Sequence, residues 1–141
     1  MDITLHITVQ QPPAGFYYGL QKGSGSQFEN EQVRLSAGVD LDFSLTVGVK
    51  TDAQTGLPRF GGPFVQGPAG GKFIYIGIGA YAGHESAWSG RLKIPLSGIT
   101  AEMVAAADNG LQTYVAGTGK NGMPACATVK PFSGWKIRDQ A

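Results

Sequence analysis

With 141 residues, the chain has the length of one domain that can bury a core without disulfides or metals. Only 15% of residues are charged and 22 are glycine, a composition that suits tight turns better than long surface helices. The formal net charge of +1 comes without a run of one sign, and no apolar window could span a bilayer. These features argue against nucleic-acid and membrane partners.

The N-terminal segment MDITLHITVQ has an acid at position 2 and no basic region, so it does not resemble a secretory signal. The single cysteine, Cys126, can form no internal disulfide, which fits a reducing compartment. We therefore expect one cytoplasmic domain covering residues 1–141.

Period-two alternation predicts two strands with one buried face each, at residues 2–9 and 40–50. Between them, residues 15–23 form a candidate strand, residues 23–32 a polar loop and VRLSAG a short strand. The first half of the chain is therefore rich in strands.

The segment 51–63 is a turn-rich connection that can contain a hairpin bend at Gln54–Gly56. The apolar run FIYI predicts a strand that can be buried on both faces. Alternation resumes at residues 90–96, where Pro95 places the end of the strand at an edge or a bulge.

One short helix is expected at about residues 101–108, because Thr100 can cap it, Glu102 suits its first turn and Asn109-Gly110 can stop it. Residues 111–117 and 125–130 are further candidate strands.

Together these elements predict an all-β fold, a mainly antiparallel barrel or sandwich of about eight strands with one short α-helix. Parallel β/α alternation is absent from the sequence. Glycine-flanked strands whose edges need covering also suggest a homodimer as a hypothesis.

The stretch from Gly77 through Gly79 to Ala82 matches the G-x-G-x-x-A form of the dinucleotide-binding turn. That turn works only when a helix follows it directly, and here the next pattern is a strand beginning near Leu92. We interpret the glycines as a bulge or a close approach of two backbones. No phosphate loop is present, and no cofactor is expected.

Metal and nucleophile motifs are equally scarce. His6, His84 and Cys126 are too widely spaced for a zinc motif. Cys126 lies in an apolar segment, so we expect it to pack as a small buried residue and not to act as a nucleophile. His6 is expected on an exposed polar face. Asp40 and Asp42 could touch calcium, but a solvated strand face explains them better.

One loop brings chemically useful side chains together within eleven residues: Tyr81, His84, Glu85, Trp88 and Arg91. Aromatic surfaces beside charged groups and an imidazole are what a polar ligand pocket uses. The alternative is a loop whose tryptophan plugs one end of a barrel.

Lys22 enters the GSGS loop and Lys130 ends a predicted strand. If both reach one barrel mouth, they could hold a small anion with Gln21 and Gln66. The alternative is that the two lysines are separate and solvated.

Three stretches resemble a family of uncharacterised bacterial and fungal proteins known only as a domain of unknown function. They are YGLQKGSGSQFE, GPFVQGPAGGKFIYIGIGAYAG with WSGRLKIPLSGIT, and PACATVKPFSGWK. The resemblance spans nearly the whole chain and implies a complete protein. It brings no activity, cofactor or catalytic residue.

These observations favour a small-molecule or protein-binding module whose ligand is small and polar or anionic. One alternative is a cofactor-independent enzyme with a barrel-end pocket, in which His84 acts as acid or base and Arg91 or Lys22 steadies an anion. The other is a purely structural or interaction protein.

Overall fold

Strands dominate the computed structural model, which describes residues 1–23, 29–67, 73–79, 88–107, 110–117 and 126–131. For residues 29, 88–89, 116 and 126–131 it describes the backbone alone. The described elements are β1 (Asp2–Gln10), β2 (Tyr17–Lys22), β3 (Glu29–Leu35), β4 (Leu41–Thr51), β5 (Pro58–Gly61), β6 (Phe73–Gly79), β7 (Trp88–Pro95), α1 (Ala101–Ala105), β8 (Leu111–Ala116) and β9 (Cys126–Pro131).

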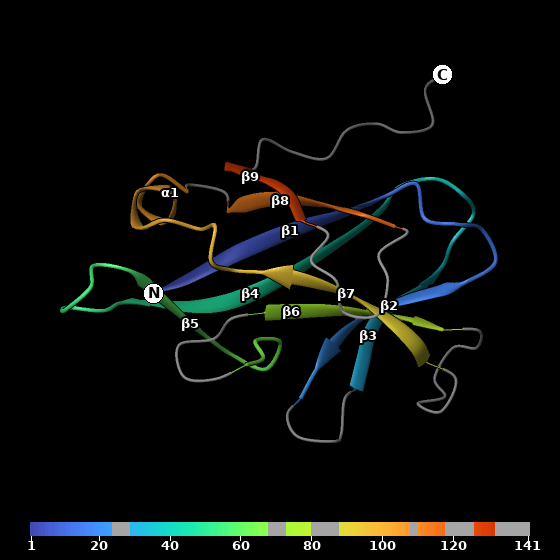
Figure 1. Ribbon diagram of the computed structural model, residues 1–141, viewed down its shortest axis with the longest axis horizontal. Helices are drawn as coiled ribbons and strands as arrows, with labels where there is room; N and C mark the ends of the chain where they lie inside the picture. Colours follow the sequence, from blue (N-terminus) through green and yellow to red (C-terminus); the bar gives the residue numbers. More distant parts are fainter. Residues whose placement is uncertain (24–28, 68–72, 80–87, 108–109, 118–125, 132–141) are drawn as a thin grey trace.

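These strands form two sheets (Figure 1). One sheet has five strands in the order β5-β4-β1-β8-β9, and the other has four in the order β3-β2-β6-β7. The arrangement is sandwich-like rather than a closed barrel, which decides between the two architectures expected from the sequence. The all-β class with one short helix is confirmed.

The two strands with the clearest alternation, β1 and β4, pair with each other in antiparallel register, with Leu5 opposite Leu45. The other edge of β1 pairs with β8, and this pairing is parallel. The remaining described strand pairs are all antiparallel, in line with the expected mainly antiparallel fold. Parallel strands cannot be joined by a tight hairpin and need a longer connection. Here the chain passes from β7 in one sheet through α1 to β8 in the other, where β8 pairs with β1.

Two predicted boundaries are wrong in informative ways. Residues 29–32, expected in a loop, belong to β3, an edge strand whose polar residues hide its period. The short β5 was expected to be part of the connection 51–63; it pairs with the end of β4. The bend at Gln54–Gly56 is confirmed, since the Asp52 carboxylate accepts a hydrogen bond from the Gln54 N–H at 2.8 Å.

The glycines of the G-x-G-x-x-A match lie within β6, and the β6–β7 register shifts between Ile78 and Gly79. A register shift here fits a bulge, which was one of the two alternatives expected for these glycines. Pro95 is the last residue of β7, an edge strand, as its missing N–H requires.

The helix α1 begins as predicted, with the Thr100 hydroxyl accepting a hydrogen bond from the Met103 N–H at 3.2 Å. It ends at Ala105, earlier than the expected residue 108, and of its residues only Val104 is fully buried. So small an apolar face gives tertiary packing little means to prolong a helix. None of the helical segments in the described ranges has the length and hydropathy to cross a bilayer.

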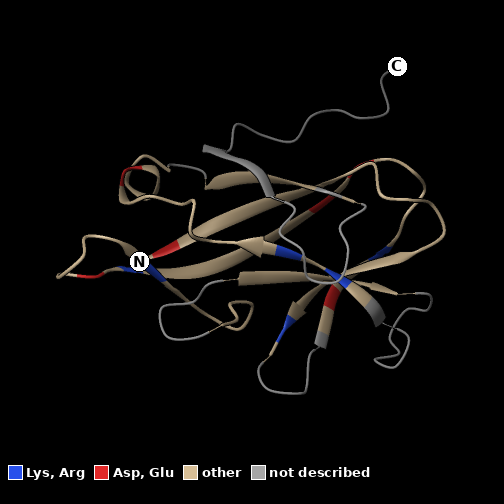
Figure 2. Ribbon diagram, in the orientation of Figure 1, with Lys and Arg blue, Asp and Glu red and all other residues tan. Residues whose placement is uncertain are grey.

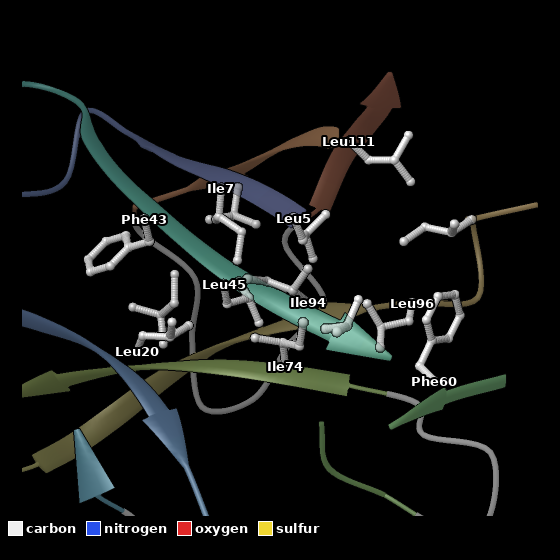
Figure 3. Close-up of a cluster of buried hydrophobic side chains, with 14 of the residues drawn as sticks. Leu5, Ile7, Leu20, Phe43, Leu45, Phe60, Ile74, Ile94, Leu96 and Leu111 are labelled. Carbon is white, nitrogen blue, oxygen red and sulfur yellow. The ribbon is translucent and has the colours of Figure 1, made fainter. Parts of the chain in front are cut away.

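Apolar side chains from both sheets meet between the layers (Figure 3). Leu5 and Phe43 come from the five-stranded sheet, and Leu20 and Ile74 face them from the other. The buried Tyr18 hydroxyl spans the layers by donating to the carbonyl of Gly117 at 2.9 Å. With its inner face occupied by this core, each sheet offers only its outer face and its edges to a ligand.

Candidate functional site

The outer face of the four-stranded sheet carries the most chemically varied group of side chains that the structure describes. Alternation along β6 places Ile74 and Ile76 in the core, and Phe73 and Tyr75 on the outside. Along β7, Leu92 and Ile94 are buried, whereas Arg91 and Lys93 face outward. Basic and acidic positions are otherwise dispersed over both sheets (Figure 2).

Four of these outward residues form an aromatic–cationic strip: Phe73, Tyr75, Arg91 and Lys93. The Arg91 guanidinium lies 4.4 Å from the centre of the Tyr75 ring, and the Lys93 ammonium 3.8 Å from that of Phe73. The two rings are stacked with centroids 6.3 Å apart. Each cation reaches the ring diagonal to it, because the direct partners are Lys93 with Tyr75 and Arg91 with Gly77.

Beside the strip lies an amide row made of Gln21 from β2, Asn30 from β3 and Gln66 from the segment between β5 and β6. Gln21 pairs with Asn30 across β2 and β3, and continuing the β2–β6 register places Gln21 next to Tyr75. Gln66 forms an isolated antiparallel bridge with Phe73. Because Phe73 and Tyr75 are two residues apart on one face, the two glutamines lie roughly 7 Å apart along the strand direction.

The amide row contains polar atoms that are buried without a hydrogen-bond partner. They are the Gln21 Oε1, Asn30 Oδ1 and Gln66 Nε2 atoms, for which the described structure provides none. The residues Gln21 and Gln66 are 7% and 9% exposed. Buried polar atoms are almost always bonded, so three such atoms on one face need a physical explanation.

A third buried glutamine shows the usual arrangement. Gln112, 4% exposed, lies on the five-stranded sheet and donates from Nε2 to the carbonyls of His6 and Thr113 at 3.1 and 2.9 Å. The same nitrogen lies 3.3 Å from the Thr8 hydroxyl. The lack of hydrogen-bond partners is therefore specific to the amide row and is not a general feature of buried glutamine in this fold.

The structure brings together only some of the residues that the sequence suggested for an anion site. Gln21 and Gln66 share the outer face, and Arg91 lies on the same face. Lys22 alternates to the opposite face and pairs with Glu31 at 2.5 Å. Lys130 belongs to β9 in the other sheet, and its side chain lies outside the described residues.

The predicted loop cluster cannot be placed as a group. Tyr81, His84 and Glu85 lie outside the described residues, as does the side chain of Trp88, which begins β7. The side chain of Cys126 is also outside. The role of His84 as acid or base stays a prediction.

The expectation that His6 is exposed is wrong. It is 9% exposed, and its Nδ1 lies 3.1 Å from the Ser44 hydroxyl on the neighbouring strand. Beside it, the Thr8 hydroxyl donates to the Asp42 carboxylate at 2.8 Å. The outer face of the five-stranded sheet is thus a hydrogen-bonded polar layer, which alternation alone cannot distinguish from a solvated face.

Four residues of the site were missed by reasoning from the sequence: Asn30, Phe73, Tyr75 and Lys93. The signal was available for three of them, because Phe73 and Tyr75 alternate with buried isoleucines and Lys93 alternates like Arg91. Treating FIYI as buried on both faces concealed it, since the two aromatic residues are only partly buried.

Fold and site together define a small two-sheet β protein that presents a polar and aromatic outer sheet face. The chain belongs to a family of unknown function, DUF5990, whose pattern it matches over residues 3–138. This match confirms the resemblance to a domain of unknown function. No curated protein and no solved structure matched the chain.

Proposed function

We propose that the protein is a binding module for a small anionic ligand that also carries hydrogen-bonding groups, held on the outer face of the four-stranded sheet. The observation that carries the proposal is the pair of buried glutamines, Gln21 and Gln66, with partnerless amide atoms on one face. A buried polar atom without a partner costs about 1–3 kcal/mol. Such a cost is expected where a bound ligand supplies the missing partner.

The aromatic–cationic strip beside the amide row is the reason for expecting a negatively charged ligand. Neither Arg91 nor Lys93 forms an ion pair with a carboxylate in the described ranges, and both are held over aromatic rings. Their positions are therefore fixed in advance, which lowers the entropy lost when an anion binds. A hydrogen bond to the shielded amides would form in a medium of low dielectric constant, where it is stronger than in water.

The address and assembly belong to the same proposal. The single cysteine supports a cytoplasmic protein, because one cysteine cannot form an internal disulfide and so suits a reducing compartment. The homodimer stays a hypothesis for solution measurements.

Replacing the amides with an apolar side chain of similar size tests the proposal. We expect Gln66→Met and Gln21→Met each to raise the free energy of unfolding of the ligand-free protein by about 0.5–2 kcal/mol, because the unpaired amide is removed. Urea denaturation measures this change. Both variants should also lose the thermal stabilisation that an anion panel of phosphate, citrate and adenosine monophosphate gives the wild type.

The matched control is Gln112→Met, which should lower the free energy of unfolding by about 1–3 kcal/mol because it removes a bonded amide. Arg91→Gln should weaken the anion-induced shift, whereas Lys50→Gln, an exposed change on the other sheet, should not. The proposal is wrong if Gln66→Met destabilises as much as Gln112→Met, or if no anion in the panel shifts the wild type.

A further inference from the structure

The outer edge of β4 is covered by side chains of β3, although the two strands belong to different sheets. The Gln32 carboxamide bonds to both backbone groups of Ser44, its Nε2 donating to the carbonyl at 2.6 Å and its Oε1 accepting from the N–H at 3.3 Å. Arg34 donates to the Asp42 carbonyl and lies over the Phe43 ring. The Gln32 side chain thus does for Ser44 what a peptide group of a neighbouring strand would do.

The next outward-facing residue along this edge is Thr46. Backbone groups alternate in direction along a strand, so Thr46 faces the same way as Asp42 and Ser44. The β4–β5 ladder begins two residues later, where Gly48 pairs with Gly61. The Thr46 carbonyl is directed towards Gly62, since a Cβ built on Gly62 would lie 3.8 Å from that oxygen. Thr46 therefore lies between the Gln32 bonds and the ladder.

A groove of about 530 Å³ opens at this position, within the usual range for ligand sites. Its lining includes Asp2, Gln32, Thr46, Gly61, Gly62 and Phe64. Asp2 is the charged residue of the lining, and three of the lining residues, Gly48, Gly61 and Gly62, are glycines with no side chain to narrow the groove.

We propose that this groove binds a short extended peptide that carries positive charge. A peptide group of the ligand bonds the Thr46 backbone as the Gln32 carboxamide bonds Ser44, which is β-strand addition over a short stretch of edge. Phe64 supplies apolar contact, and the Asp2 carboxylate selects a cationic side chain. The groove uses none of the residues of the aromatic–cationic strip or the amide row, so it is a separate site from the anion site proposed above.

Nuclear magnetic resonance titration with two blocked pentapeptides tests this site. One alternates valine with lysine, and the other replaces each lysine with glutamate. We expect the lysine peptide to shift the amide signals of Thr46 and Gly62 and to bind at least fivefold more tightly than the glutamate peptide. Asp2→Asn should weaken binding of the lysine peptide about two- to fivefold, as expected for an exposed ion pair.

A matched pair of glycine variants shows where binding takes place. Neither Gly61 nor Gly98 has a positive φ or any atom within 4 Å of a built Cβ, so both positions leave room for a side chain to begin without backbone strain. Gly61→Leu fills the groove and should reduce lysine-peptide affinity at least tenfold, while Gly98→Leu should leave it unchanged. Equal binding of the two peptides, an unaffected Gly61→Leu variant, or no shift at Thr46 at millimolar peptide would each overturn the proposal.

Discussion

Gly110→Ala is expected to lower the free energy of unfolding by ~2–5 kcal/mol. Gly110 has φ +96°, where an L residue costs about 1–2 kcal/mol. In addition, the new methyl group would overlap the Thr4 carbonyl oxygen and lie 3.2 Å from the His6 Nε2 atom. Relieving that overlap means moving β8 away from β1, and overpacking of this kind costs about 1–3 kcal/mol. Chemical denaturation measures the loss.

A second glycine separates the backbone cost of a positive φ from the cost of the steric overlap. Gly15 has nearly the same φ, +92°, but no atom lies within 4 Å of its built Cβ. Gly15→Ala should therefore carry only the backbone cost of about 1–2 kcal/mol. Equal losses for the two variants would show that the contact between Gly110 and Thr4 does not limit how closely β1 and β8 approach.

Tyr18→Phe is expected to cost about 1–3 kcal/mol, because it leaves the buried Gly117 carbonyl without the hydroxyl that bonds it. The ring itself stays in the core, so the loss reports the hydrogen bond between the layers. Tyr17→Phe, on the outer face of the same strand, is the control and should change stability by less than about 0.5 kcal/mol. Similar losses for both variants would contradict this account.

The same tyrosine makes stability depend on pH in alkaline solution. Burial raises the pKa of Tyr18 above its ordinary value of 10.0. Between the unfolded and the folded pKa, the unfolded chain is ionised while the folded protein keeps its proton, so the free energy of unfolding falls as pH rises above about 10. Tyr18→Phe lacks this contribution, and its stability should decline less steeply there. Parallel curves for wild type and variant would refute the assignment.

The fold class was predictable because β1 and β4 carry their apolar residues at period two, and a one-residue slip would expose the whole set. The capped helix start at Thr100 was predictable for a similarly local reason. The features that were not predicted depend on contacts between segments far apart in the sequence. The polar edge strand β3 lacks an apolar face to reveal it, and the parallel β1–β8 pair depends on where a distant segment returns.

The site was harder to predict because its chemistry depends on how neighbouring strands are aligned. Gln21 and Gln66 were suspected as a pair, but the expected partner Lys22 faces the other way and bonds Glu31. The cations over Phe73 and Tyr75 depend on the diagonal offset between β6 and β7, which no single strand encodes. A sequence pattern shows which face a residue takes, whereas its neighbours on that face come from register.

The central position of β1 bears on how the chain reaches its native state. During synthesis this strand emerges before both of its partners and can pair with β4 early, but its second edge is closed only when Leu111 comes to lie beside Leu5. Until then one edge of a strand with an apolar face is open to pairing with other chains, the situation that makes proteins with distant contacts fold slowly and aggregate. Recombinant protein should therefore be recovered best under slow expression at low temperature, where nascent chains are dilute.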